Sequence, residues 1–284
     1  MNKSSFRLLP LVPLVSALFV IGAPAAQAVG LEQSPIDITS NNTVYNPNLP
    51  KLNFNLSSDA GLKVINNGSP AVDKTAVRAN LDDPSASTLS VNGDTYTLSQ
   101  FHFHAPAEHL ENGYKYPMEM HLVFQDANKH LLVVGRWVQE GSFNQTLDPI
   151  FSHIPQDTST TLPVSHFNLN ALLPDHLNSF RYNGSLTTPD FGEGVKWVDL
   201  STPMDMSKEQ INAFSSLFPN GDAREVQALN GRIVQTDLPG FTVTSIPEPE
   251  TYAMMLVGLG MIGFIANRRR RMNSLQSGVL PAVV

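Results

Sequence analysis

Short apolar runs, in which buried-type and polar residues alternate, recur along the chain and are separated by Gly, Pro, Asn and Asp. Alternation with a period of two is typical of β-strands with one buried face, and clusters of turn residues mark where strands end. The tripeptide Asn92-Gly93-Asp94 predicts a hairpin turn between two such runs. We predict strands at residues 62–66, 88–91, 95–103, 119–125, 131–139 and 196–200.

Helical periodicity is rare by comparison. Residues 207–218 show it, with Ser207 as the N-cap and Gln210 three positions later, which is the pattern of a capping box. Residues 148–153 predict a short turn of helix. No internal repeat or low-complexity linker interrupts the pattern. It therefore predicts a single β-rich domain, mainly β with small peripheral helices.

Residues 1–28 have the organisation of a secretory signal peptide. Lys3 and Arg7 precede an apolar run at residues 8–21, and Ala26-Gln-Ala28 supplies small residues for cleavage. The alternative is an N-terminal membrane anchor, but the apolar run is shorter than the span of about 20 residues that a bilayer requires. We therefore expect the chain to be exported.

The segment at residues 246–271 is organised just as clearly. A Pro-Glu-Pro tripeptide precedes an apolar run at 252–266, and four arginines follow at 268–271. Arginines that close an apolar run are typical of the cytoplasmic end of a transmembrane helix. An ordinary tail anchor is one interpretation. The segment also resembles the PEP-CTERM sorting signal of exported bacterial proteins, and that resemblance implies processing by an exosortase, with residues 272–284 as a tail.

The body between these ends, residues 29–245, is long enough for one domain with a sizeable core. The chain has 18 basic and 25 acidic residues, of which six basic and two acidic ones lie in the two ends, so the body carries a net charge of −11. An acidic body argues against a nucleic-acid partner. We expect it in the periplasm, at the cell surface or outside the cell, with the membrane contacted only through the C-terminal helix. The chain has no cysteine, which excludes disulfides and thiolate metal ligands.

Three histidines occupy positions that suit a metal site. Because side chains alternate along a strand, His102 and His104 share one face with Gln100, and His121 shares a face with Glu119 in a second apolar run. Two neighbouring strands would bring the three imidazoles around one ion, and three histidines with an open fourth position are the ligand set of a catalytic zinc. Gln100 and Glu119 would then fix the histidine tautomers. The alternative is that these histidines are ordinary core residues, which is the commoner outcome for a lone histidine between two phenylalanines.

The run Gln100-Phe-His-Phe-His-Ala-Pro-Ala-Glu108, with Glu119-Met-His121 after it, resembles the zinc-binding segment of the α-class carbonic anhydrases. The resemblance implies a large, mostly antiparallel twisted sheet and reversible, zinc-dependent hydration of carbon dioxide to bicarbonate and a proton. Three further blocks resemble the family in the same order: Gln33-Ser-Pro-Ile-Asp-Ile38, Tyr182-Asn-Gly-Ser-Leu-Thr-Thr-Pro189 and Val226-Gln-Ala-Leu-Asn-Gly-Arg232.

The resemblance also assigns roles to single residues. It implies that Thr187 accepts a hydrogen bond from the zinc-bound hydroxide and donates one to Glu108, and that Thr188 contacts bicarbonate. It implies a backbone carbonyl as the third partner of the zinc histidines. The remaining assignments are Zn²⁺ on His102, His104 and His121, an apolar wall for carbon dioxide formed by Val123, Val133, Leu186 and Trp197, and cavity water ordered by Asn67.

The chain departs from the family at the cavity mouth and in one loop. Ser69 stands where the family usually carries a histidine that exports the proton, and serine does not titrate near neutral pH. This predicts slowed proton transfer. Asp190 and Phe191 stand where bacterial relatives commonly have a proline and then a disulfide-forming cysteine. The alternative function is a non-catalytic, carbonic-anhydrase-related surface binding module, but such proteins typically lack a zinc histidine, whereas this chain has all three.

Overall fold

The computed structural model describes residues 30–68 and 77–241. The predicted signal peptide, the sorting segment at 246–271, the tail at 272–284 and Ser69 lie outside the described residues. Within the described ranges, no helix is long and apolar enough to cross a bilayer.

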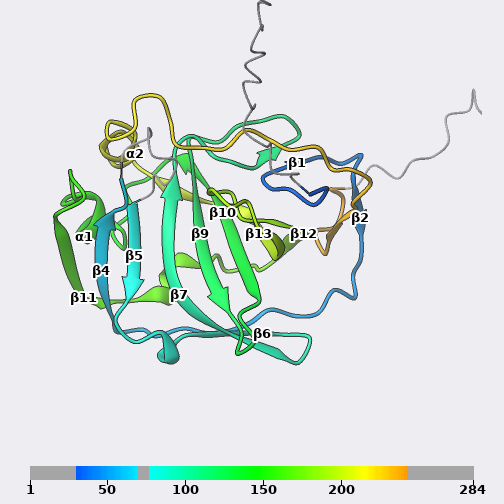
Figure 1. Cartoon of the computed structure of the whole chain (residues 1–284), viewed down its shortest axis with the longest axis horizontal. Coiled ribbons are helices and arrows are strands. Elements are labelled where there is room, and N and C mark those ends of the chain that lie inside the picture. The colour runs from blue at the N-terminus through cyan, green and yellow to red at the C-terminus, as the bar shows by residue number, and fades with distance from the viewer. Residues whose placement is uncertain (1–29, 69–76, 242–284) are drawn as a thin grey trace, which may run out of the picture.

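One large twisted sheet of 12 strands forms the centre of the described chain (Figure 1). Its main path runs through β11 (Thr161–Phe167), β4 (Ala60–Asn66), β5 (Val77–Leu81), β7 (Asp94–His104), β9 (Met118–Gln125), β10 (Leu131–Glu140), β13 (Glu193–Met206), β12 (Ser179–Ser185), β14 (Val234–Thr236) and β2 (Thr43–Tyr45). Beside this path, β6 (Thr88–Val91) pairs with β7 and with β3 (Asn53–Asn55). Only β10–β13 and β14–β2 pair in parallel within this sheet, which confirms the predicted, mostly antiparallel architecture.

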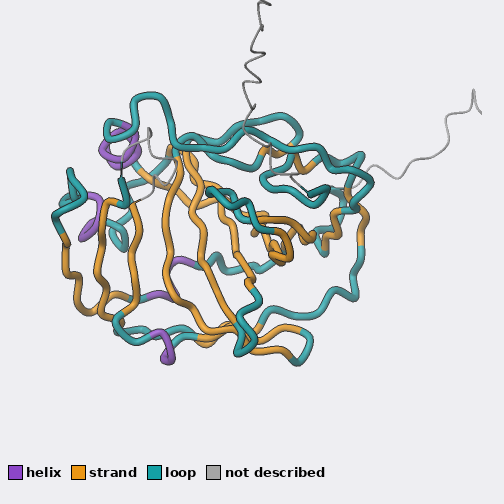
Figure 2. The backbone as a smooth tube through the Cα atoms, in the orientation of Figure 1, coloured by secondary structure: helices purple, strands orange, loops and turns teal. Residues whose placement is uncertain are grey.

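The remaining elements are small and peripheral (Figure 2). Strands β1 (Asp37–Ile38) and β8 (Leu110–Glu111) form a separate parallel pair. The helices in residues 30–68 and 77–241 are α1 (Asp148–Phe151), α2 (Lys208–Ser215) and two short 3₁₀ turns at Pro84–Ala86 and Leu169–Leu172.

Helix α2 begins where the sequence predicts and ends earlier. Ser207 caps it, and the side chain and backbone of Ser207 exchange hydrogen bonds with Gln210, so the predicted capping box is present. The helix ends at Ser215 instead of continuing to Phe218. Phe218 precedes Pro219, and a proline disfavours the helical conformation in the residue before it.

All six predicted strands are present, and the hairpin between β6 and β7 is confirmed. Asn92 and Gly93 both have positive φ angles, 54° and 87°, as a type I′ turn requires. The strands that the pattern did not predict are β1, β2, β3, β5, β8, β11, β12 and β14.

The two faces of the central strands serve different purposes. Phe101 and Phe103 point into the main apolar core, where Phe103 packs edge-on against Phe151 of α1 with ring centroids 5.0 Å apart. By the alternation along β7, His102 and His104 point to the other face. The same strand therefore builds the core with one face and the candidate site with the other.

Arg136 ties β10 to the neighbouring strand β13 and to the 3₁₀ turn at Leu169–Leu172. Its side chain donates to the carbonyl oxygens of Thr202 at 3.0 Å, Leu172 at 2.7 Å and Pro203 at 3.1 Å. Burial lowers the pKa of the guanidinium to about 10, which leaves it charged at neutral pH. A single buried cation thus satisfies three backbone acceptors.

Candidate metal centre

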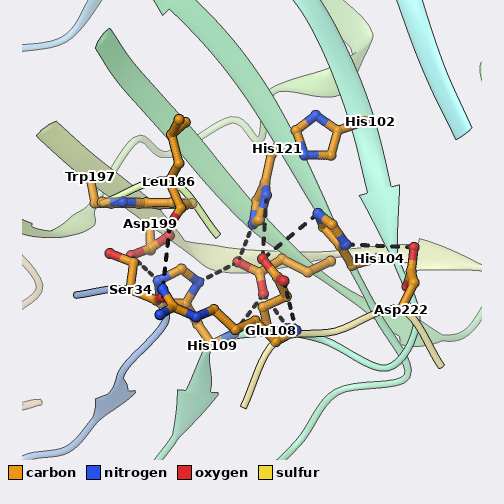
Figure 3. A network of polar contacts seen from close by, with 12 residues as sticks. Ser34, His102, His104, Glu108, His109, His121, Leu186, Trp197, Asp199 and Asp222 are labelled. Atoms are coloured by element: carbon orange, nitrogen blue, oxygen red, sulfur yellow. Dashed lines mark hydrogen bonds and ion pairs between the residues drawn. The ribbon is translucent and has the colours of Figure 1, made fainter. Parts of the chain in front are cut away.

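Strand register brings the three predicted histidines together. His102 on β7 is the direct cross-strand partner of His121 on β9, and His104 lies two positions further along β7. The ring centroids of His104 and His121 are 5.0 Å apart, and those of His102 and His121 are 5.1 Å apart. One nitrogen from each ring lies within 4.8 Å of the others (Figure 3). The arrangement could hold one metal ion.

Two of the rings are oriented by the predicted partners. The Nδ1 atom of His102 is 2.9 Å from the amide oxygen of Gln100, and Nε2 of His121 is 2.9 Å from the Glu119 carboxylate. A histidine ligand binds a metal through one nitrogen and donates from the other. These contacts therefore leave Nε2 of His102 and Nδ1 of His121 available to the centre.

His104 provides the test of whether a metal fits. The ring is 1% exposed, and neither of its nitrogens has a hydrogen-bond partner among the residues that the structure describes. Its Nε2 atom lies on the side of the other two histidines, 3.7 Å from a Glu108 carboxylate oxygen. Buried polar atoms without partners cost about 1–3 kcal/mol each. A cation at Nε2 would satisfy this one, and three imidazole nitrogens suit zinc.

The electrostatic surroundings of His104 also favour a cation. Burial lowers the pKa of this imidazole, but Glu108 and Asp222 outweigh burial and raise it to about 9. At His102, burial and the two neighbouring histidines hold the pKa well below its usual range. The carboxylates of Glu108 and Asp222 thus make the surroundings of His104 negative, which stabilises positive charge there. The surroundings of His102 consist of neighbouring imidazoles and disfavour positive charge.

A cavity of about 320 Å³ opens beside the histidines. Cross-strand pairing places Val123 of β9 opposite Val133 of β10, and Val133 opposite Trp197 of β13. The indole nitrogen of Trp197 donates to the Ser185 carbonyl at 2.9 Å, which fixes the ring. The sequence-predicted residues that line the cavity are Asn67, Gln100, His102, His121, Val123, Val133, Leu186, Thr187, Thr188 and Trp197.

Glu108 and Thr187 both lie at this centre, but they are not joined in the structure. Glu108 is buried, and one of its oxygens accepts from the backbone N–H of Arg224 at 2.9 Å. The other oxygen has no hydrogen-bond partner in the described part of the chain. In residues 30–68 and 77–241, no hydrogen bond connects Thr187 to Glu108. The relay that the resemblance implies is therefore not formed here.

The loop that carries Thr187 and Thr188 is held by side-chain contacts. Asp190 and Phe191 adopt positive φ angles of 82° and 44°. The guanidinium of Arg224 lies 3.7 Å from the centre of the Phe191 ring, and Gln33 donates to the Phe191 carbonyl at 3.2 Å. A cation–π contact and a side-chain hydrogen bond thus fasten a strained turn beside the cavity.

Sequence reasoning missed several residues behind the ligands. His109 bridges Glu119 at 2.8 Å and the Tyr182 hydroxyl at 2.7 Å. Burial raises the pKa of Glu119, but His109 and His121 outweigh burial and hold it well below its usual range. One ligand atom from each of His109, Glu119 and His121 also lies within 4.8 Å of the others, but both histidines already hydrogen-bond to Glu119. This favours the group of three predicted histidines as the metal site. His109 directly follows the predicted site residue Glu108 in the sequence, and this position is the signal that could have pointed to it.

Asp222 is a second missed residue. Among the described residues, Nδ1 of His104 has no hydrogen-bond partner, neither the backbone carbonyl that the resemblance implies nor a side chain, and the Asp222 carboxylate lies 3.6 Å from it. Asp222 is more than one hundred residues from His104 in sequence, and no pattern along the chain connects them.

Comparison with known proteins agrees with this geometry. Residues 22–238 match the family described as eukaryotic-type carbonic anhydrase, and residues 245–271 match the PEP-CTERM protein-sorting motif. A carbonic anhydrase of Pectobacterium atrosepticum is 37% identical over 211 residues, which are 72% of this chain and 80% of that protein.

Solved structures extend the likeness to the fold. The α-carbonic anhydrase of Thermovibrio ammonificans, solved with the inhibitor sulfanilamide, superposes with a TM-score of 0.67 at 35% identity and covers 73% of this chain and 88% of that one. The Photobacterium profundum α-carbonic anhydrase gives a TM-score of 0.65 at 34% identity, with coverages of 73% and 90%. The chain is therefore an enzyme of the eukaryotic-type, or α-class, carbonic anhydrase family and carries a PEP-CTERM sorting motif at its C-terminal end.

Proposed function

We propose that this enzyme catalyses the zinc-dependent, reversible hydration of carbon dioxide to bicarbonate and a proton outside the cytoplasm. The observation that carries the proposal is the convergence of three imidazole nitrogens, within 4.8 Å of one another, beside a cavity with an apolar wall. These residues would hold a zinc ion, which would supply Lewis acidity and lower the pKa of a bound water to about 7, a magnitude established on carbonic anhydrase itself.

The chain's own residues divide the work of binding and orientation. His102, His104 and His121 would hold the metal, and Gln100 and Glu119 would fix the tautomers of two of them. Carbon dioxide is small and apolar, so it binds best against an apolar wall. Val123, Val133, Leu186 and Trp197 supply that wall at the cavity.

Thr187, Thr188 and Glu108 would act on the reacting atoms or directly behind them. We assign to the Thr187 hydroxyl the orientation of the attacking water, and to Thr188 contact with bicarbonate. Both residues line the cavity. The unpaired oxygen of Glu108 is a free acceptor for the Thr187 hydroxyl. We expect that hydrogen bond to form once the centre is filled.

Proton export would be the slow part of the cycle. The proton must leave the cavity for solvent, and an imidazole carries it well because imidazole titrates near neutral pH. Ser69 offers no such group. Asn67 lines the cavity and would order water there, but its amide side chain does not carry protons.

The ends of the chain would determine where the enzyme works. Residues 1–28 would direct export, residues 29–245 would form the catalytic domain, and residues 246–271 would act as the sorting segment for an exosortase. The enzyme would then contact the membrane only through its C-terminal segment, before release or attachment at the cell surface. The PEP-CTERM match supports this arrangement.

Stopped-flow carbon dioxide hydration by the zinc-loaded protein, over a series of imidazole concentrations, tests the proposal. We expect zinc-dependent activity that rises strongly with imidazole, because the buffer replaces the missing carrier. His104→Ala should lose zinc and activity together. Inactivity at every imidazole concentration would reject the proposal in favour of a non-catalytic binding module, an alternative that the complete histidine set disfavours.

A further inference from the structure

We propose that the side-chain carboxylate of Asp222 accepts a hydrogen bond from Nδ1 of His104 when the metal is bound, and that Asp222 is thereby the third positioning residue of the metal centre. The inference rests on the proposed zinc-dependent function and deepens it. It assigns to a charged side chain a place for which the resemblance implies a neutral backbone carbonyl.

The fold fixes Asp222 beside its target. One carboxylate oxygen accepts from the backbone N–H of Ala105 at 2.8 Å, and the backbone N–H of Asp222 donates to the Ala105 carbonyl at 3.2 Å. Gly221, with φ of 74°, allows this approach, because a Cβ there would lie 3.1 Å from the Ala105 carbonyl oxygen. Ala105 directly follows His104, so two hydrogen bonds hold Asp222 next to the ligand.

The second carboxylate oxygen of Asp222 is uncommitted. It is buried and lies 3.6 Å from Nδ1 of His104, and within residues 30–68 and 77–241 neither atom has a hydrogen-bond partner. Figure 3 shows His104 between Glu108 on one side and Asp222 on the other. A separation of 3.6 Å exceeds the usual N–H···O range by about 0.5 Å, so a small movement of either side chain closes it.

Metal binding creates the demand for this acceptor. A metal at Nε2 of His104 requires the neutral imidazole, so the ring proton resides on Nδ1. In a buried site an unpaired N–H is costly, and Asp222 presents a free acceptor to it. A hydrogen bond to a carboxylate is also stronger than one to a neutral oxygen.

The consequence is a centre with two carboxylates behind its ligands. Glu119 accepts from His121, Asp222 would accept from His104, and the neutral amide of Gln100 faces His102. Carboxylate partners make an imidazole a better donor to a metal. Asp222 should therefore increase the affinity of the site for zinc.

The test measures zinc affinity of the whole chain by competition with a chromophoric chelator. Asp222→Asn keeps an acceptor for the Ala105 N–H but removes the charge, whereas Asp222→Ala removes both. We expect the zinc dissociation constant to rise about 10-fold in the first variant and up to about 100-fold in the second. Thermal unfolding of the metal-free Asp222→Asn protein should match the parent.

A matched control is Asp237→Asn. Asp237 also accepts a backbone N–H, from Ser179 at 2.7 Å, but it is not among the residues at the centre. It should leave zinc affinity unchanged. The Nδ1–H proton of His104 in the zinc-loaded protein gives an independent NMR readout. It should exchange slowly with solvent in the parent and fast in Asp222→Ala.

The inference would be overturned if Asp222→Asn bound zinc as tightly as the parent and its His104 Nδ1–H proton exchanged as slowly as in the parent. An equal loss of affinity in Asp237→Asn would also overturn it. If Asp222→Ala fails to fold, Asp222→Asn decides the question alone. Failure of the parent protein itself to bind zinc would instead overturn the proposed function.

Discussion

One hydroxyl, that of Thr187, carries the proposed orientation of the attacking water. Thr187→Ala removes both its acceptor and its donor, so kcat/KM for carbon dioxide hydration should fall by about 100-fold or more. Thr187→Ser keeps the hydroxyl and should retain most activity. Stopped-flow rates measure this, and metal analysis should show unchanged zinc in both variants. Full activity in Thr187→Ala would remove Thr187 from the mechanism.

Ser69 makes the opposite kind of prediction, a gain. Ser69→His restores a group that titrates near neutral pH, so kcat in dilute buffer without imidazole should rise about 10-fold or more. The value of kcat/KM should stay the same, because proton export follows the conversion of carbon dioxide. Ser69→Asn is the control. The advantage should vanish at high imidazole, and its persistence there would contradict the proposed role.

Single residues of the candidate site could be predicted only where the alternation along one strand determines which way their side chains point. His102, His104 and His121 could be placed on facing strands because period two decides which side chains share a face. Asp222 and Arg224 could not, since loops far along the chain deliver them to Ala105 and Glu108. Their positions depend on three-dimensional packing, which no alternation in the sequence encodes.

Among the elements, β10 depends on Arg136 for its connection to neighbouring segments. Arg136→Met would leave three backbone carbonyls without their donor. We expect the free energy of unfolding to fall by about 2–4 kcal/mol, because hydrogen bonds from charged groups are strong and buried acceptors are costly to abandon. Denaturant unfolding measures the change. Arg136→Lys keeps the charge but not the several donors of the guanidinium, so it should lower the free energy of unfolding by less. Equal losses in the two variants would contradict this account.

One aromatic ring, that of Phe191, contributes to the hold on the loop between β12 and β13. Phe191→Ala removes the face on which Arg224 rests, a contact of about 0.5–2 kcal/mol. The turn with two positive φ angles should then open more often, which hydrogen exchange across residues 186–193 would detect as faster exchange. Carbon dioxide hydration should slow as well, because Thr187 lies on this loop. Phe143→Ala, at an exposed phenylalanine elsewhere, is the control and should alter neither measurement.

The strands that could be predicted are rich in Val, Ile, Leu, Phe and Thr and are bounded by turn residues, and the hairpin has its own Asn-Gly signal. Strand β5 alternates too, but its five residues include Arg78 and Asn80, and β11 contains Pro163. Such strands exist because neighbouring strands supply hydrogen-bond partners and cover, which is a property of the assembled sheet and not of the segment.

For the whole molecule, the sorting segment should decide its cellular fate. Replacing the Pro-Glu-Pro tripeptide at residues 247–249 by alanines removes the proposed signal but leaves the apolar run. The enzyme should then accumulate at its larger mass in the membrane fraction, whereas the parent should appear shortened and outside that fraction. Mass spectrometry of the separated fractions measures this. Identical products from both proteins would contradict exosortase processing.

The histidines of the candidate centre come from β7 and β9, two hydrogen-bonded strands in the middle of the large sheet. Their spacing is set by strand register and not by the closure of one body upon another. The reactants are also small enough to reach the centre by diffusion. Such an enzyme should need no large conformational change during turnover. Immobilised in a gel, cross-linked in a crystal or attached to a cell envelope, it should keep its intrinsic turnover, limited only by the supply of gas and buffer.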